Sequence, residues 1–445
     1  MNDFNENQIE NLPLFQIDNT PIEIIFNREE QSSDGGLILL KEIENQTGII
    51  EKISNCINDG RDQRYIDHSL SSLLNQRVFQ IASGYEDAND CDTLRHDSII
   101  KICSNESEDL SPLASQPTMS RFENSITRTE LYRIARAFVD SFISSYDNEP
   151  PVIILDCDDT NNNTHGDQQL TLFNTYYGEY CYMPLHIYEG LSGKLITTIL
   201  RPGRRSKTID IFKIMKKIII LLREHWKNTS IIVRGDSHFC SADLMDWSNS
   251  QHKIYFLTGL STNNILRNKC KTTIESAENA FYATGKPTKM FYSFMYKANT
   301  WNQTQRVVAK IEKNEKGLNI RFIVTNAREF RSQGLYQAYC NRGNMELFIK
   351  EHKLYLKSDR SSCNSFTANQ LRLFLHSAAY VLLHILRTKL LKNTKYFNCT
   401  IKTVQLKFLK IAAHVRKLKT KIKIELPKYF STKNEFIKCF KVLNI

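Results

Sequence analysis

The spacing of apolar residues divides the chain into a helical region, a strand-rich region and a basic end. From Gly36 to about Tyr146, apolar positions recur every three or four residues, which predicts amphipathic helices. After the Glu-Pro-Pro break at 149–151 the pattern changes to short, nearly continuous apolar runs between turn residues. Such runs are typical of strands that are buried on both faces of a sheet.

The strand-rich region predicts three strands, a helix, a strand, a short helix and a further strand. The first three strands are expected to form a meander. This is the order of an RNase H-like core, an α/β fold in which helices cover a mixed sheet. The predicted strands are 151–160, 180–190, 193–203, 229–236 and 253–261, and the predicted helices are 206–228, opened by a Ser206 cap, and 241–251.

Three more strand patterns follow before the chain becomes helical again. They predict a β-rich antiparallel insertion within the core, followed by a long helix at 333–357. The predicted organisation is a helical N-terminal domain (1–148), the first part of the core (149–261), the insertion (262–330), the rest of the core (331–393) and a basic C-terminal region (394–445).

Aspartates end the first and fourth predicted core strands. The first strand ends in Asp156, Asp158 and Asp159, and the fourth ends in Asp236. These strands are neighbours in an RNase H-like sheet, so we expect their carboxylates to face each other. Clustered carboxylates suit two Mg²⁺ or Mn²⁺ ions in phosphodiester chemistry, although aspartate also ends strands simply because it suits turns. Asp156 and Asp158 share a face; Asp158, nearer the strand end, is favoured as the first ligand, with Asp156 as the alternative.

A helix is expected to supply the third carboxylate. The segment YCNRGNMELFIKEHK (339–353) places Tyr339, Arg342, Glu346 and Lys353 within an arc of roughly 60° on an ideal helix. Glutamate suits a metal, while arginine, lysine and tyrosine suit a phosphate backbone. A solvated charged face with helical ion pairs explains the same spacing equally well.

Composition narrows the possible partners and location. The chain has 445 residues, 41% of them hydrophobic, and a net charge of +11, which suggests a polyanionic partner. Its eleven cysteines form no Cys-x-x-Cys motif, and this suits a reducing cytosol. The N-terminus is not a signal peptide, and the longest apolar run (373–386) predicts a buried helix that is too short for a bilayer. We therefore expect a cytoplasmic protein without membrane contact, which disfavours an adhesion role for the Arg-Gly-Asp-Ser sequence at 234–237.

Several polar and basic residues are candidates for DNA contact. Thr118, Ser120 and Arg121 lie early in a short predicted helix after a turn, as in a helix-turn-helix, although a plain helical hairpin fits as well. Arg234 and His238 flank Asp236 and are placed to meet phosphate. Arg204 follows the third core strand, where a solvated turn is the alternative explanation.

The end of the chain is strongly basic. Residues 387–441 contain sixteen Lys or Arg and only two acids, Glu425 and Glu435. Within them, residues 417–426 alternate basic and apolar positions, as a strand with one charged face would. This pattern favours a surface that follows a phosphate backbone with salt-dependent affinity.

These motifs together resemble a known family. Tyr-x₂-Arg-x₃-Glu-x₆-Lys is the signature of the Y-R-E-K class of DDE transposases from bacterial insertion sequences, and the chain matches it at every position. Other segments resemble the insertion-sequence family numbered thirteen-eighty, most specifically residues 156–204. The resemblance implies an RNase H-like catalytic domain interrupted by a β-rich insertion. It also implies a triad of Asp158, Asp236 and Glu346, with Tyr339, Arg342 and Lys353 handling phosphate. Asp156 and Asp158 both remain candidates, because both lie in the family's Asp-x-Asp-x-Thr stretch.

The resemblance also implies a reaction and its partners. The protein would bind the terminal inverted repeats of its element, hydrolyse the phosphodiester at the element end, and join the freed 3′-hydroxyl to target DNA. Pairing two ends requires at least a homodimer, acting at the nucleoid in the bacterial cytoplasm. The alternatives are an RNase H-like nuclease without strand transfer and a catalytically silent DNA-binding relative.

Overall fold

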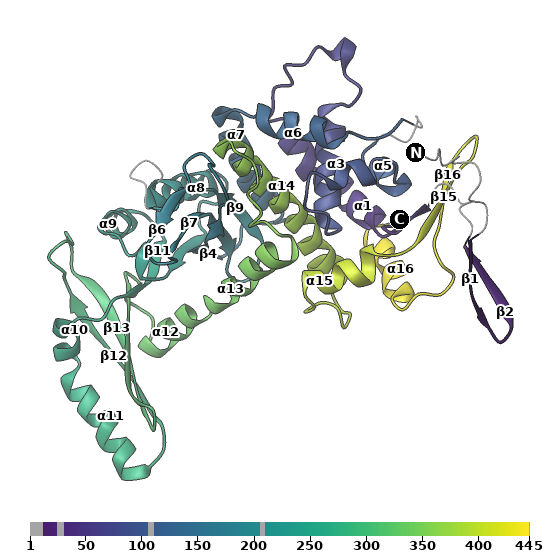
Figure 1. The fold of residues 1–445 in the computed structure, drawn as a ribbon. Coiled ribbons are helices and arrows are strands. Elements are labelled where there is room, and N and C mark those ends of the chain that lie inside the picture. The colour runs from purple at the N-terminus through teal and green to yellow at the C-terminus, as the bar shows by residue number, and fades with distance from the viewer. Residues whose placement is uncertain (1–11, 25–30, 106–110, 205–209, 445) are drawn as a thin grey trace.

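A mixed eight-stranded sheet lies at the centre of one half of the molecule (Figure 1). The computed structural model describes residues 12–24, 31–105, 111–204 and 210–444. Strand order is β12-β13-β14-β11-β10-β4-β8-β9. β4 is parallel to β10 and antiparallel to β8, which confirms the predicted α/β core with its mixed sheet. The five predicted strands are β4 (Val152–Asp159), β8 (Leu185–Glu189), β9 (Leu195–Ile199), β10 (Ser230–Gly235) and β11 (Ile254–Leu260).

Helices cover both faces of this sheet. Side chains from α7 (Arg128–Ser144), α8 (Ile211–His225) and α9 (Ala242–Ser250) share one apolar core with the inner strands. Asp210 caps α8, and the cap expected at Ser206 lies outside the described residues. The opposite face lies against α12 (Ser332–Cys340), α13 (Gly343–Lys350) and α14 (Phe366–Ile385).

The predicted strand at 180–190 is divided at Met183-Pro184. Proline has no backbone N–H for a strand ladder, so a single strand cannot continue through it. The first part, β7 (Glu179–Tyr182), joins β5 (Asn162–Asn163) and β6 (Leu172–Asn174) in a small separate sheet.

The insertion contains helices as well as strands. β12 (Thr288–Tyr296), β13 (Gln305–Asn314) and β14 (Gly317–Thr325) are antiparallel, as predicted. β14 also pairs with β11, so these strands extend the main sheet. The prediction was wrong before residue 285, where α10 (Asn264–Lys269) and α11 (Lys271–Thr284) replace β structure. α11 packs on β12 and β13, and together they form an arm that projects from the core (Figure 1).

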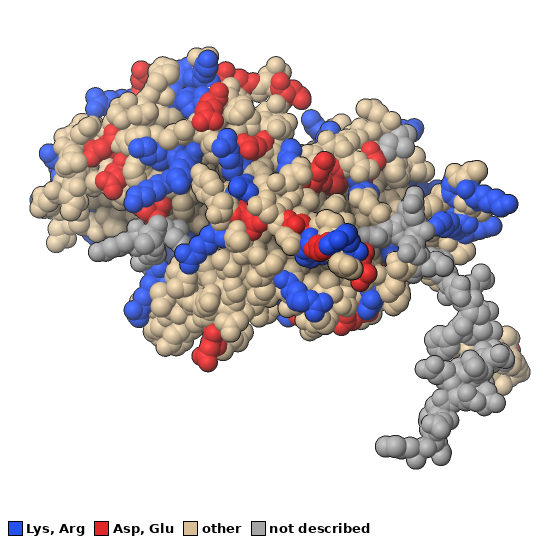
Figure 2. All heavy atoms as spheres, turned by 90° about the horizontal axis from the view of Figure 1, so that it is seen from above, with Lys and Arg blue, Asp and Glu red and all other residues tan. Residues whose placement is uncertain are grey.

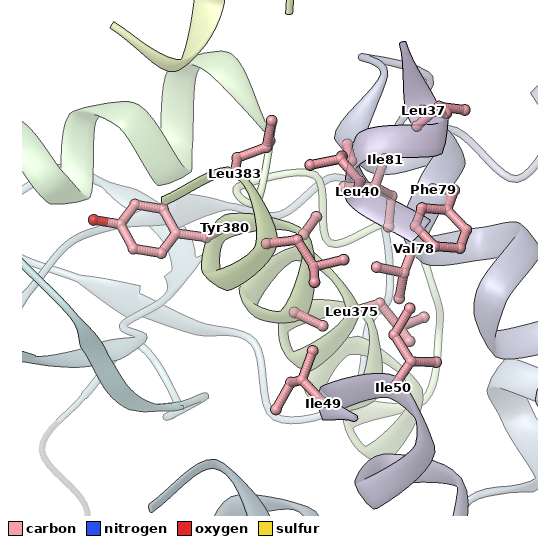
Figure 3. Close-up of a cluster of buried hydrophobic side chains, with 14 of the residues drawn as sticks. Leu37, Leu40, Ile49, Ile50, Val78, Phe79, Ile81, Leu375, Tyr380 and Leu383 are labelled. Carbon is pink, nitrogen blue, oxygen red and sulfur yellow. The ribbon is translucent and has the colours of Figure 1, made fainter. Parts of the chain in front are cut away.

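A second apolar core forms around α14. Figure 3 shows Leu375 and Leu383 of this helix packed toward Leu40, Val78 and Phe79. The apolar run at 373–386 is therefore a buried helix, as predicted. N-terminal and C-terminal helices share this core, so the boundaries predicted at 148 and 394 do not separate independent cores. The other helices are α1 (Leu37–Thr47), α2 (Ile49–Ser54), α3 (Leu70–Ala82), α4 (Asp90–Leu94), α5 (Ser98–Cys103), α6 (Gln116–Ser125), α15 (Ile401–Val404) and α16 (Lys433–Val442).

Two small sheets lie at the ends of the chain. β3 (Gln31–Ser32) pairs with β15 (Ala413–Lys417), which pairs with β16 (Ile422–Glu425). The strand predicted at 417–426 is thus the turn and second strand of a hairpin. β1 (Leu12–Ile17) and β2 (Thr20–Ile24) form a hairpin that projects from the body (Figure 1). Among the described residues, no helix has the length and apolarity needed to cross a membrane.

Four buried histidines lie on or near α14: His376 and His384 belong to this helix, His352 to the segment after α13, and His186 to β8. His186 of β8 packs against His352, with ring centroids 5.1 Å apart, and His352 Nε2 lies 3.2 Å from Ser377 Oγ. Burial lowers the pKa of all four, to about 3 for His186 and His384 and well below the ordinary value for His352 and His376. Unfolded histidines take up protons near pH 6.5. Their stabilising contribution is therefore complete above that pH and is lost as the pH falls toward the folded pKa.

Stability is expected to fall steeply between pH 7 and pH 5. Each buried histidine contributes a loss of about 2 kcal/mol in the free energy of unfolding over that range. Urea denaturation measures the free energy of unfolding at pH 7 and at pH 5. In His384→Gln, the difference between these two free energies should be about 2 kcal/mol smaller than in the wild type. The exposed His252 provides the control, because His252→Gln should keep the wild-type pH dependence. An unchanged pH dependence in His384→Gln would contradict this assignment.

Candidate active site

Asp158 and Asp236 lie side by side at the ends of two parallel strands. Arg234 of β10 pairs in register with Asp156 of β4, so the residues two positions further on, Asp236 and Asp158, meet at the same edge. Both line one cavity of about 290 Å³. Asp236 ends the strand by capping a 3₁₀ turn at 237–239, where His238 N donates to its Oδ1 at 2.7 Å. The predicted juxtaposition is therefore present in the structure.

Asp156 is committed to a buried ion pair. Arg234 Nε donates to Asp156 Oδ1 at 2.5 Å and Nη2 donates to Oδ2 at 2.6 Å, with both side chains at most 1% exposed. A third donor of Arg234, Nη1, bonds the Ala338 carbonyl at the end of α12. Gly190 makes room for the pair, because a Cβ there would lie 2.5 Å from Asp156 Oδ2. In this structure Arg234 holds the sheet to α12 and is not placed for the predicted phosphate contact, and Asp156 has no oxygen directed into the cavity of Asp158.

Each of the other two carboxylates of β4 also meets an arginine. Arg342 Nη1 donates to Asp158 Oδ2 at 2.8 Å, and the Arg201 guanidinium bonds Asp159. Arg201 is buried and also donates to the Met183 carbonyl, so it fixes the loop beside the cavity. Because Asp158 and Asp159 point to opposite faces of β4, only Asp158 faces α12 and α13.

Asp158 is poorly stabilised as an anion. Burial raises its pKa to about 6, the Arg342 guanidinium opposes this shift, and the charges of Asp236 and Asp159 add to it. Two carboxylates that share a confined cavity form a hard-oxygen donor set of the kind that divalent cations prefer. The donor chemistry of Asp158 and Asp236 therefore fits Mg²⁺ or Mn²⁺.

Glu346 does not complete a three-carboxylate group in this conformation. It lies on α13 one turn after Arg342, and its side chain is exposed. Across the described parts of the chain, no three His, Cys, Asp or Glu side chains are arranged to hold a metal. The charged side chain of this segment that contacts Asp158 is Arg342, not Glu346.

The predicted long helix is divided, yet three members of its polar face still meet the site. α12 ends at Cys340, α13 begins at Gly343, and a π-helical turn follows at Glu351–Tyr355. Lys353 in that turn donates to the Asn161 carbonyl at 2.6 Å and so anchors the loop after β4. Burial raises the pKa of Tyr339, and its hydroxyl packs so closely on Gly259 that a Cβ there would lie 2.7 Å away.

The outer wall of the cavity carries basic and aromatic residues. Arg204 and His238 both line it and both are exposed, which agrees with their predicted places. Arg204 Nε also donates to the Phe173 carbonyl at 3.0 Å. The sequence argument missed Tyr176 and Tyr177, which line the cavity beside the small β5–β7 sheet. The run of tyrosines at 176–182 was the available signal.

The residues predicted to read DNA lie on α6, and none of them lines the cavity of Asp158 and Asp236. Thr118 accepts a bond from Arg121 Nη2 at 3.1 Å, Arg121 is exposed, and Ser120 is partly exposed. α5 ends at Cys103, so residues 104–115 separate it from α6. Part of this connection lies outside the described residues, so the helix-turn-helix assignment of α6 stays a prediction.

Comparison with known proteins adds two similarities. A family model described as "Transposase DDE domain group 1" matches residues 15–445. Among solved structures, the cryo-EM structure of a piggyBac transposase synaptic complex with hairpin DNA is similar, with a TM-score of 0.45 and 11% sequence identity. That match covers 85% of this chain and 81% of the other chain. No curated protein matches the sequence.

Proposed function

Because this chain belongs to the family of transposases with a group 1 DDE domain, we propose that it is an insertion-sequence transposase of the Y-R-E-K class, from family thirteen-eighty. It would cleave DNA at the terminal inverted repeats of its element and join the freed ends to target DNA in the bacterial cytoplasm. The observation that carries this proposal is the meeting of Asp158 and Asp236 in one cavity, with Arg342 against Asp158.

The catalytic carboxylates would be Asp158, Asp236 and Glu346, holding two Mg²⁺ or Mn²⁺ ions. When bound, such ions supply an activated water or 3′-hydroxyl and stabilise the leaving oxygen. Asp158 takes precedence over Asp156 because both oxygens of Asp156 are engaged by Arg234.

Arg342 would change partners when DNA binds. In the absence of DNA its guanidinium compensates the charge of Asp158 at 2.8 Å. A DNA phosphate offers the same bidentate acceptor geometry as a carboxylate. Transfer of Arg342 to phosphate would release Asp158 and clear the approach for Glu346 on the next turn of α13. Tyr339 and Lys353 would support this movement from either side, and His238 and Arg204 would meet the DNA at the outer wall.

DNA would also be held far from the cavity. We assign Thr118, Ser120 and Arg121 of the helical N-terminal region to recognition of the terminal repeats. The β15–β16 hairpin is a further candidate, because its exposed residues 416–423 include Arg416, Lys419, Lys421 and Lys423. Figure 2 shows Lys and Arg gathered at the end of the molecule where this hairpin lies in Figure 1. Two such chains, as a homodimer, would bring two element ends together.

Neutralising the turn of this hairpin should weaken DNA binding in a salt-dependent way. In Lys419→Gln/Lys421→Gln, the slope of log affinity against log salt should fall by about 2, because each lysine that meets a phosphate releases about one counterion. Fluorescence anisotropy with terminal-repeat DNA at several salt concentrations measures the slope. Lys227→Gln, at an exposed lysine beyond α8, is the control. If the hairpin variant and the control had the same slope, the β15–β16 hairpin would not be part of the DNA-binding surface.

One experiment separates transposition from its alternatives. Purified protein, Mg²⁺, a pre-cut terminal-repeat oligonucleotide and plasmid DNA should yield covalently joined products. Cutting without joining would identify a nuclease. Binding without either reaction would identify a silent relative.

A further inference from the structure

The N-terminal hairpin exposes apolar side chains that no other part of the described chain covers. Phe15, Ile17 and Ile24 are 63%, 55% and 41% exposed. Figure 1 shows the hairpin projecting away from the body of the molecule. An isolated two-stranded hairpin is only marginally stable in water, so this one needs a surface to pack against.

A large apolar groove lies elsewhere on the molecule, between α7, α8, the end of β9 and the start of α14. Its volume is about 830 Å³. Leu131, Ile199, Ile214 and Phe374 are among the residues that form its floor. Tyr132 at its edge is 55% exposed and lies under the Lys217 ammonium, 4.9 Å from the ring centroid.

Groove and hairpin carry opposite charges. The groove is bordered by five basic residues and a single acid, Asp210. The hairpin, residues 12–24, contains two acids and no lysine or arginine. Complementary charge around an apolar contact favours encounter and fixes orientation. The basic residues are Arg128, Arg136, Arg204, Lys213 and Lys217; the acids of the hairpin are Asp18 and Glu23.

The hairpin and the groove of one chain lie apart. β3 is fixed to β15 at one end of the molecule, while α8 and β9 lie beyond the helical core (Figure 1). In this arrangement the hairpin does not cover the groove of its own chain, which favours a groove on a second molecule (Figure 1).

We propose that the hairpin of residues 12–24 docks in the α7–α8 groove of a second copy of this chain, so that two reciprocal contacts form a symmetric dimer. Exchange of an identical terminal element is an economical route to a closed dimer. Pro202 and Arg204 line both the groove and the cavity of Asp158 and Asp236, so each hairpin would sit beside the partner's catalytic cavity. This interface would serve the homodimer of the proposed function, but it does not depend on the DNA chemistry.

Sedimentation velocity of the full-length protein without DNA, from low to high micromolar concentration, tests the proposal. The wild type should be a dimer. Two variants, Phe15→Glu/Ile17→Glu in the hairpin and Lys213→Glu/Lys217→Glu in the groove, should each weaken dimerisation by roughly tenfold or more. Lys286→Glu/Lys316→Glu, at exposed lysines on the projecting arm, is the matched charge-reversal control and should remain dimeric. Circular dichroism and thermal melting verify that every variant is folded.

Mixing the hairpin variant with the groove variant provides the decisive measurement. An equimolar mixture should regain mixed dimers, because the hairpin of the groove variant meets the intact groove of the hairpin variant. Adding Asp18→Lys/Glu23→Lys to the groove variant should restore its dimers. A monomeric wild type, dimers that survive either variant, or a mixture that stays monomeric would each overturn the proposal. Mg²⁺-dependent DNA cleavage is measured separately, so loss of the dimer contact and loss of catalysis can be told apart.

Discussion

Replacing Asp236 with asparagine should abolish Mg²⁺-dependent nicking of terminal-repeat DNA, with a loss of about 10³-fold or more. Asparagine keeps the size of the side chain and can still accept the bond from His238 N, so the turn after β10 should persist. What is lost is an anionic oxygen in the cavity shared with Asp158. Cleavage of an end-labelled repeat oligonucleotide measures the effect, and gel mobility shift should show that DNA binding remains.

Asp243→Asn is the matched control for this experiment. Asp243 is an exposed aspartate in the first turn of α9. It follows Asp236 closely in the sequence but does not line the cavity. The control should cleave at the wild-type rate. If Asp236→Asn also cleaved at that rate, the assignment of Asp236 as a metal ligand would be wrong.

Arg234→Ala should lower the free energy of unfolding by about 3–5 kcal/mol, because it leaves the buried Asp156 carboxylate without its partner. The pair is nearly inaccessible to solvent, and the arginine also bonds the end of α12. Urea denaturation at pH 7 measures the change. A phosphate-contacting arginine on the surface would affect DNA binding and leave stability nearly unchanged.

Two further variants show where that loss comes from. Arg64 forms an exposed ion pair with Asp62 at 2.7 Å, and Arg64→Ala should leave the free energy of unfolding nearly unchanged, because water screens an exposed pair. Asp156→Leu/Arg234→Met removes both charges together and should recover much of the stability that Arg234→Ala loses. No recovery in the double variant would show that the contact to α12, and not the unpaired carboxylate, determines the cost.

The apolar pattern of the sequence was sufficient for the core strands. Buried parallel strands need unbroken apolar runs, so β4 and β10 were identifiable, and the RNase H-like order then placed Asp158 beside Asp236. α11 was missed because only Ala277 of this helix is buried, so it lacks a broad apolar face. α12 ends at Cys340, α13 begins at Gly343, and a π-helical turn follows at Glu351–Tyr355. The periodicity argument tested one continuous helix and therefore detected neither the break nor the π-helical turn.

The choice between Asp156 and Asp158 could not be made from the sequence. Both residues lie on the same face of one strand, so periodicity treats them alike. The deciding partner is Arg234, which is 78 residues away and meets Asp156 only through the register of β4 and β10. The sequence argument placed Arg234 at the phosphate because it considered near neighbours along the chain. Glu346 was assigned through the family signature, and the structure leaves its approach to Asp158 as a proposal.

Pairing between the two ends of the chain has a consequence for synthesis in the cell. Gln31 of β3 pairs with His414 of β15, and Gly35 N donates to the Ile411 carbonyl at 2.7 Å. Contacts between such distant residues form late, because a long loop must first be closed. The helical core around α14 therefore cannot close until the ribosome has released nearly the whole chain. A polypeptide that stops before residue 400 should remain open and prone to aggregation, so that only complete translation yields a protein able to act on DNA.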